Sequence, residues 1–384
     1  MLVLLLLACG DLDTDTGPTP AAPGADPTAD CLSRWTDGVL EIDPQGPDTQ
    51  IHSEALFDGE HLWFAWNRPN QDRNFDIWAT VQTCDGRTVL DPFMVSESTE
   101  NELDPVMAAS GERVLIAWTG SASGGLDIRY RLYDRAASPV TAATRLEASR
   151  AEEVVTGNAT LPAVAALDDG FLLAGSWGHP DAPAFQAFAV AISPDGALDG
   201  EAEDIELDTN SGQTYVDLDV LDGEAHLVWQ EDTTTSDDPA AWHAPLGAPA
   251  TRLGTPGARP AITLTSSGPW LAWDDNQGTV YVLPPGGSSQ ALDLGRGIHH
   301  NPRLAASGDT VAVLVMTVDS GIYNQLQLAT LDASGVTAIH ALSATAAPSI
   351  YEASLVLVDD HHAVVAWQEG ENPAFRAWAE WLSW

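Results

Sequence analysis

The sequence of 384 residues repeats one pattern seven times. In each repeat an apolar strand leads through a short turn, usually of the Asp-Gly or Ser-Gly kind, to a second apolar strand that ends at a Trp or its substitute. Repeats of about 40 to 50 residues built from short strands are typical of β-propeller blades. The sequence therefore predicts an all-β fold, a seven-bladed β-propeller of four-stranded antiparallel blades. The second strands are expected at Trp63–Trp66, Leu115–Trp118, Leu172–Gly175, His226–Trp229, Trp270–Trp273, Val313–Val315 and Val364–Trp367.

The two ends of the chain predict how the ring closes. The seventh repeat ends after its third strand, near Phe375 to Trp381, whereas Val39 to Ile42 read as a fourth strand with no blade before them. Pairing these segments would leave no exposed sheet edge, which otherwise promotes aggregation. We therefore expect an N-terminal strand to complete the last blade.

A proline recurs near the first strand of four repeats. Because proline has no amide hydrogen to donate, we expect each of these residues to begin its strand. The four are Pro105, Pro162, Pro260 and Pro302.

The charge of the chain is strongly unbalanced. Asp and Glu number 56 against 15 basic residues, all of them Arg, which gives a formal net charge of −41. This charge repels nucleic acid phosphates and anionic membrane surfaces, so metal cations, basic ligands and basic proteins are better partners. The simpler alternative is that acidity only keeps the protein soluble, as in a salty habitat.

The first residues form a short apolar run that ends at Cys9. The segment Leu6-Leu7-Ala8-Cys9 resembles the lipobox of bacterial lipoproteins, here joined to β-propeller repeats. The resemblance implies that residues 1–8 are a signal peptide and that Cys9 is acylated, so that lipid alone anchors the protein in the bacterial cell envelope, at the outer membrane and facing either the periplasm or the cell surface. A buried strand is the alternative, since eight apolar residues are too few to span a bilayer as a helix.

The segment that follows has a different composition. Residues 9–30 are rich in Asp, Thr and Pro, so after the lipidated Cys9 they read as a flexible tether. The propeller domain then covers residues 31–384. Cys31 and Cys84 are the remaining cysteines, and in an exported protein they are expected to form a disulfide, with two free thiols as the alternative. Cys31 would begin the closing strand, so this bond would hold that strand against the first blade.

Loops that enter the first strands share one face of a propeller with loops that join the second and third strands. Here both sets are acidic, which suits a calcium ion, a cationic ligand or the acid-base hydrolysis of a glycan. For any single residue, a solvated loop position is the simpler alternative. The candidate ligand face on the entry loops comprises Glu54, Glu102, Asp104, Asn158, Tyr215, Arg259, His299, His300, Asn301, Tyr351 and Glu352.

The motifs of several enzyme classes are absent from the sequence. Without lysine there is no phosphate-binding loop and no Schiff-base chemistry, and neither Gly-x-Ser-x-Gly nor His-Glu-x-x-His occurs. We therefore expect first a monomeric, surface-anchored module that binds a protein or glycan without catalysis. An extracellular polysaccharide hydrolase or lyase is the second expectation, and a structural envelope component is the third. A deep pocket holding two carboxylates would favour the enzyme, and a shallow acidic face would favour the binder.

Overall fold

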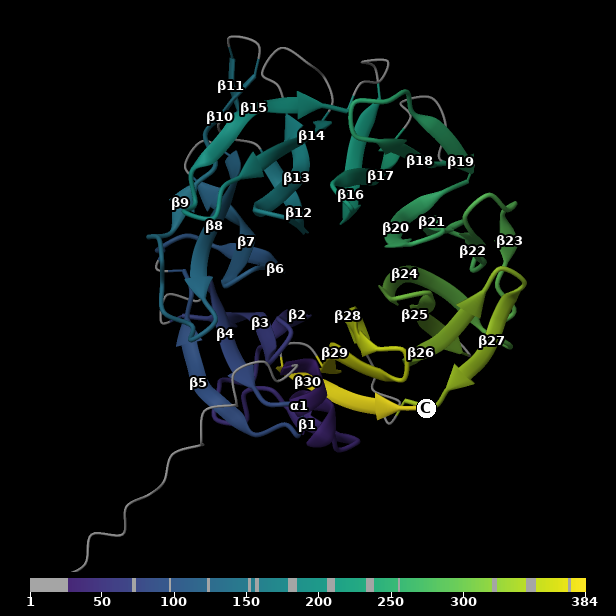
Figure 1. Cartoon of the computed structure of the whole chain (residues 1–384), viewed down its shortest axis with the longest axis horizontal. Coiled ribbons are helices and arrows are strands. Elements are labelled where there is room, and N and C mark those ends of the chain that lie inside the picture. The colour runs from purple at the N-terminus through teal and green to yellow at the C-terminus, as the bar shows by residue number, and fades with distance from the viewer. Residues whose placement is uncertain are drawn as a thin grey trace, which may run out of the picture.

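The strands of the computed structural model form a ring of seven four-stranded antiparallel sheets (Figure 1). The first strands of these sheets line a central channel. Each sheet is one blade, and the predicted seven-bladed propeller is confirmed. A two-stranded ribbon, β10 (Ala148–Arg150) with β11 (Glu153–Val155), lies outside the blades. The structure describes residues 27–70, 74–96, 98–122, 125–150, 153–155, 159–178, 185–205, 211–232, 238–254, 256–319, 323–342, 350–371 and 374–384.

The first strand of each blade lines the channel, and the second strand pairs with it. In blade order the first strands are β2 (Ile51–Phe57), β6 (Glu102–Ser110), β12 (Ala159–Leu167), β16 (Gly212–Leu221), β20 (Ala258–Thr265), β24 (Ile298–Ser307) and β28 (Ile350–Asp359). The second strands are β3 (Leu62–Pro69), β7 (Arg113–Ala122), β13 (Gly170–Gly178), β17 (Glu224–Asp232), β21 (Gly268–Asp274), β25 (Thr310–Asp319) and β29 (His362–Glu371).

The third and fourth strands form the outer part of each blade. The third strands are β4 (Phe75–Gln82), β8 (Gly125–Asp134), β14 (Phe185–Ile192), β18 (Ala240–Pro245), β22 (Val280–Leu283), β26 (Tyr323–Asp332) and β30 (Ala374–Ser383). The fourth strands are β5 (Thr88–Met94), β9 (Thr144–Arg145), β15 (Leu198–Asp204), β19 (Thr251–Gly254), β23 (Gln290–Ala291), β27 (Gly335–His340) and, in the last blade, β1 (Gly38–Glu41).

The ring closes as the chain ends predicted. Strand β1 pairs antiparallel with β30, with Gly38 opposite Trp381 and Glu41 opposite Trp378. The last blade is therefore built from both ends of the described chain. Closure in this way covers the outer edge of β30, which would otherwise be free to pair with another chain.

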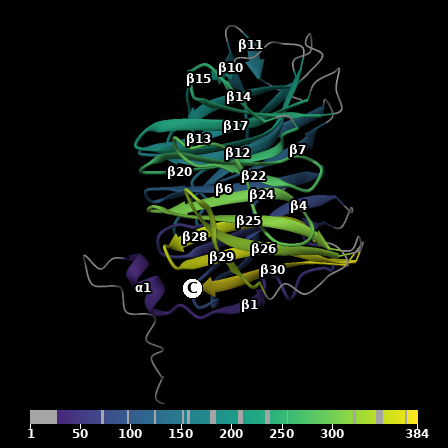
Figure 2. The same ribbon diagram turned by 90° about the vertical axis from the view of Figure 1, so that its right-hand side faces the viewer.

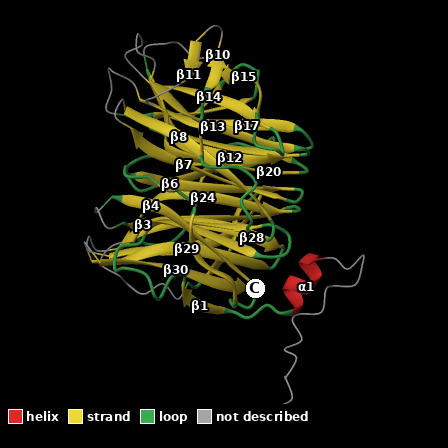
Figure 3. Ribbon diagram, turned by 90° about the vertical axis from the view of Figure 1, so that its left-hand side faces the viewer, coloured by secondary structure: helices red, strands yellow, loops and turns green. Residues whose placement is uncertain are grey.

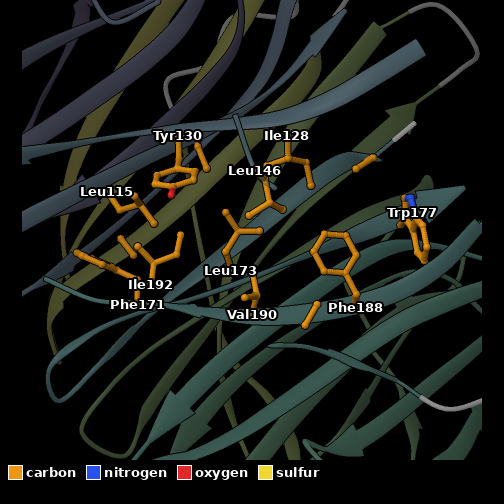
Figure 4. Packing of buried hydrophobic residues seen from close by; sticks show 14 of the residues in the cluster. Leu115, Ile128, Tyr130, Leu146, Phe171, Leu173, Trp177, Phe188, Val190 and Ile192 are labelled. Atoms are coloured by element: carbon orange, nitrogen blue, oxygen red, sulfur yellow. The ribbon is translucent and has the colours of Figure 1, made fainter. Parts of the chain in front are cut away.

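Tight packing between neighbouring blades forms the core. Leu115, Ile128 and Tyr130 of the second blade are buried against Leu173 and Phe188 of the third (Figure 4). Fully burying a side chain of this size contributes roughly 1.5 to 3 kcal/mol. Five second strands carry a Trp that is buried in the core, and each strand continues beyond it: Trp66, Trp118, Trp229, Trp273 and Trp367.

An irregularity interrupts the pairing of every first strand with its second strand close to the channel mouth. In six of the seven strands a residue other than Gly has a φ between 47° and 55° at this point, which bulky residues rarely adopt. The recurring prolines directly follow such a residue, inside their strands, so the expectation that they begin the strands was wrong. A bulge suits proline because it leaves a residue without a ladder partner. These prolines are Pro105, Pro162, Pro260 and Pro302.

Polar side chains latch each blade to the next at these bulges. The residue that follows the Trp of a second strand is polar and buried, and in four blades it accepts a hydrogen bond from the backbone N–H of the next blade's bulge. The acceptor and donor pairs are Gln368 with His52, Thr119 with Leu161, Gln230 with Arg259, and Asp274 with Asn301.

Replacing Asp274 with Ala should lower the free energy of unfolding by about 3 kcal/mol. The fully buried carboxylate accepts two bonds from the Arg259 guanidinium, at 2.8 and 2.9 Å, in addition to the N–H of Asn301. Urea unfolding followed by tryptophan fluorescence measures the loss. Asp274→Asn keeps the shape and one acceptor oxygen, so it should lose less. Equal stability of the Ala variant and the wild type would show that the latch contributes nothing.

The N-terminal part of the described chain is a short helix, α1 (Pro27–Ser33). It lies on the side of the ring where the turns between first and second strands gather, away from the channel mouth (Figures 2 and 3). Its Thr28 hydroxyl donates to the carbonyl of Gly59 in one of these turns, at 3.5 Å. Cys31 and Cys84 form the expected disulfide, with their Cα atoms 5.2 Å apart. However, Cys31 belongs to α1 and not to the closing strand, because that strand begins only at Gly38.

Within the described residues, no helix is long and apolar enough to cross a membrane.

Candidate functional site

The bulges place one residue of each blade at the mouth of the channel, and we call these the rim residues. Each occupies the same position in its first strand, and a bulge of this kind redirects a side chain away from the regular pleat. Three of them, Asp104, Arg259 and Glu352, carry a carboxylate or a guanidinium group, and most of the others are polar. The rim residues are His52, Asp104, Leu161, Tyr215, Arg259, Asn301 and Glu352.

A second ring lies two residues further along the same strands. Because alternate residues of a strand share one face, this ring also points to the channel, about 7 Å below the rim at 3.3 Å per residue. Most of its members are small or apolar, so the charged ones stand out. The second-ring residues are Glu54, Val106, Ala163, Asp217, Ala261, Arg303 and Ser354.

A cavity of about 590 Å³ opens at the rim and extends into the channel. Residues from all seven first strands line it, so protein surrounds it on every side. Its volume falls within the range of small-molecule sites, about 300 to 1,000 Å³. The lining includes Glu54, Asp217 and Arg303 from the second ring. The channel mouth is therefore a deep polar pocket and not a shallow face.

A charged contact joins three blades at the rim. His52 Nδ1 lies 2.5 Å from Asp104 Oδ1 and 2.9 Å from Glu352 Oε2, so one imidazole contacts a carboxylate from the blade on either side. Burial alone would lower the pKa of His52, but the two carboxylates outweigh burial and raise the pKa to about 10. At neutral pH this imidazole is a cation that contacts both carboxylates and offsets one of their two negative charges.

The same three side chains are the described residues best placed to hold a metal. Their ligand atoms lie within 4.8 Å of one another. A nitrogen with two carboxylates suits Zn²⁺ or Mn²⁺ better than Ca²⁺, which prefers oxygen ligands. Any such ion would have to replace the proton on His52 Nδ1, which already serves both carboxylates. The calcium expected from the composition stays a prediction.

Two carboxyl groups of the second ring have raised pKa values that differ from each other. Burial raises the pKa of Glu54 to about 8, assisted by the negative charges of Asp217 and Glu352 and opposed by Arg303. Burial also raises the pKa of Asp217, to about 6, opposed by Arg303 and by the backbone N–H groups of Ile262 and Leu218. Both side chains meet water only through the channel, so they are partly exposed and yet enclosed by protein. Between pH 6 and 8 Glu54 is mostly protonated and Asp217 mostly ionised.

Six residues of the predicted ligand face line the cavity. Arg259 is held there by its bonds to Asp274, and Tyr215 is 47% exposed. The structure therefore brings more than half of the predicted face together at one mouth. The six are Glu54, Asp104, Tyr215, Arg259, Asn301 and Glu352.

Three other predicted residues do not line the cavity. Glu102 is fully buried beside the second blade, where it accepts a bond from Arg129 at 2.8 Å and another from the Trp118 indole. His299 is buried with its Nδ1 2.9 Å from the hydroxyl of Thr317, and His300 is half-buried. All three positions precede the bulge, and the contacts of Glu102 and His299 hold these two side chains within their sheets.

Further predicted residues lie beyond what the structure describes. Asn158 and Cys9 fall outside the described residues, and Tyr351 belongs to β28 while its side chain is not described. Their proposed roles stay predictions.

Three charged residues of the mouth were not predicted from the sequence: His52, Asp217 and Arg303. One signal could have found Arg303, because it directly follows Pro302 and the residue after each bulge proline belongs to the second ring. In the first and fourth blades Ser53 and Val216 stand where other blades have proline, so no such marker identifies His52 or Asp217.

Comparison with family models and with curated proteins finds no match. Solved structures with a similar fold do exist. The polysaccharide lyase Uly1 matches with a TM-score of 0.57 and 11% identity over 91% of this chain and 92% of that chain. A protein of unknown function from Dyadobacter fermentans gives 0.54 and 10%, over 90% and 99%. The sialidase of Trypanosoma rangeli, bound to the inhibitor DANA, gives 0.50 and 10%, over 78% and 57%. This likeness shows the fold alone.

Proposed function

We propose that the protein is a glycoside hydrolase that cleaves a neutral or basic extracellular glycan at the channel mouth. The observation that carries this proposal is the enclosed cavity of about 590 Å³ in which Glu54 and Asp217 face the same space. A deep pocket with two carboxyl groups is what distinguishes an enzyme from a shallow binding surface. The expectation of a non-catalytic binder is therefore second, and it shares the same site.

The two carboxyl groups divide the roles of acid and base. Glu54, protonated at neutral pH, donates its proton to the glycosidic oxygen as the bond from that oxygen to the anomeric carbon breaks. The ionised Asp217 stabilises the positive charge that develops on the sugar and accepts a proton from the water molecule whose hydroxyl is added to the anomeric carbon. Arg303 keeps Asp217 ionised through its positive charge, since it opposes the effect of burial.

The charge of the protein favours hydrolysis over elimination. A lyase abstracts a proton beside a carboxylate of its substrate, so it needs an anionic sugar. A chain with a net charge of −41 repels an anionic polymer. The mouth offers no excess of positive charge to attract one, because the cationic His52, Arg259 and Arg303 stand there beside the carboxyl groups of Glu54, Asp104, Asp217 and Glu352. The similar fold of a polysaccharide lyase and a sialidase supports only that such a ring can hold glycan chemistry.

A panel of neutral, amino-sugar and uronic-acid polysaccharides tests this proposal. New reducing ends from a neutral or amino-sugar member, without the ultraviolet absorbance of an unsaturated product, are the expected result. Unsaturated products from a uronic-acid polymer would replace hydrolysis by elimination. If calorimetry detects binding of a glycan but no cleavage occurs, the proposed hydrolysis would be wrong, and a non-catalytic binding module would be the better account.

The activity should depend on pH in a bell shape, with limbs in kcat/KM near pH 6 and pH 8. Activity is lost below the lower limb because Asp217 is protonated there, and above the upper limb because Glu54 is ionised. Replacing Arg303 with Gln removes a charge that lowers both pKa values, so both limbs should move to higher pH. Initial rates between pH 4 and 10 measure the profile. If both limbs of Arg303→Gln stay at their wild-type pH, Arg303 does not set the pKa values of Glu54 and Asp217.

We also propose that the enzyme works at the outside of a bacterial envelope, tethered by lipid on Cys9. The apolar run and the segment Leu6-Leu7-Ala8-Cys9 support this address. Mass spectrometry of the mature N-terminus tests it. A diacylglyceryl group on Cys9 is expected, and an intact Met1 or cleavage at another residue would contradict it.

A further inference from the structure

The pocket at the mouth has no open side in the described part of the ring. All seven first strands contribute to its wall, and the closing pair of β1 with β30 completes the seventh blade. A groove open at both ends lets the middle of a polymer lie across catalytic groups. A ring of strands does not, because a chain crossing the rim would meet protein on both sides of the pocket.

The reactive groups lie below the level of this rim. Glu54 and Asp217 are two residues further along their strands than His52 and Tyr215, which places them about 7 Å deeper at 3.3 Å per residue. This depth is of the order of one sugar residue. A glycosidic bond can therefore reach the two carboxyl groups only when a terminal residue has entered the pocket.

An exposed aromatic ring marks the entrance. Tyr215 is 47% exposed, and it holds this place with a φ of 51°, which a bulky residue rarely adopts and which signals a constrained position. It precedes Asp217 by two residues on β16, so the ring stands at the rim of the strand that carries the base. The flat apolar face of a sugar packs well on such a ring.

We propose that the channel mouth accepts only the end of a glycan chain, which enters against Tyr215, so that the protein releases sugars stepwise from that end. This inference rests on the proposed hydrolysis for its chemistry and on the closed wall for its specificity. Tyr215 is a positioning residue: it touches the chain at the rim and takes no part in proton transfer.

Linear oligosaccharides of glucose, xylose and glucosamine, each made with a free end and with a bulky group on that end, test the inference. Stepwise release of one or two residues from the free ends, with blocked chains left intact, is the expected result. Early fragments of intermediate length, or cleavage of blocked chains, would overturn end-specific entry while leaving hydrolysis in place.

Calorimetry with the same oligosaccharides separates the two proposals. If free-ended chains bind and blocked chains do not, but nothing is cleaved, hydrolysis fails and end-specific entry stands. If no chain binds and none is cleaved, both are overturned.

Variants of Tyr215 test its role. Tyr215→Ala should raise KM about tenfold, with kcat within about twofold of the wild type, and Tyr215→Phe should behave as the wild type because the ring is retained. Leu221→Ala is the matched control, since Leu221 is an exposed apolar residue of the same strand at its other end. An unchanged KM in Tyr215→Ala would remove Tyr215 from the site.

Discussion

Replacing Glu54 with Gln should lower kcat/KM for the cleaved glycan at least about 100-fold and leave its binding nearly unchanged. The amide keeps the size of the carboxyl group and its hydrogen-bonding shape, but its N–H groups are not acidic enough to transfer a proton to the leaving oxygen. Initial rates of reducing-end formation and calorimetric titration of the same oligosaccharide measure the two quantities separately. A variant that cleaves at the wild-type rate would exclude Glu54 as the acid.

A stability measurement and a control variant distinguish a loss of catalysis in Glu54→Gln from a folding defect. The folded pKa of Glu54 lies above its ordinary value of 4.5, so its ionisation opposes folding and stability is lost as the pH rises through about 8. Glu54→Gln should therefore be at least as stable as the wild type at pH 9. Glu371→Gln is the matched control, because Glu371 is an exposed carboxylate at the end of β29 that does not line the cavity. Its activity should equal that of the wild type.

Removing the disulfide by Cys31→Ala with Cys84→Ala should lower the free energy of unfolding by about 4 kcal/mol. The bond joins residues 53 apart in the sequence, so it removes much of the chain entropy of the unfolded state. It also holds α1 and the segment leading to β1 against the first blade, where the ring closes. Urea unfolding of the oxidised protein, the reduced protein and the double variant measures the effect. The last two should agree, and a difference below about 1 kcal/mol from the oxidised protein would contradict this role.

The architecture was predictable because the repeat appears directly in the residues. In five blades a Trp of the second strand is buried between blades, and a short turn, usually with Gly, precedes that strand, so both recur at regular spacing. The closing strand was predictable for a related reason: β30 would have an open edge without β1. The helix around Cys31 was not, because seven residues without a clear apolar stripe carry little signal.

The site was predictable only in part, because its geometry depends on an irregularity within the strands. Glu54, Asp104 and Glu352 were found by assigning acidic residues to the entry loops. The bulge determines which of these neighbours face the channel, and proline marks it in only four blades. Glu102 precedes the bulge and is buried, whereas Glu54 follows it and lines the cavity. The raised pKa values of Glu54 and Asp217 arise because all seven blades enclose these side chains. No short segment of the sequence shows this enclosure, so the pKa values could not be predicted from it.

The position of α1 also shows which face of the ring lies opposite the channel mouth. The helix contacts the turn at Gly59, on the face where the turns between first and second strands lie, and the disulfide fixes it there. Pro27, where the described chain begins, therefore lies on the face of the ring opposite the channel mouth. Under the proposed anchoring through Cys9, the mouth would open away from the membrane, and polymers would be shortened from their ends before they reach the cell surface.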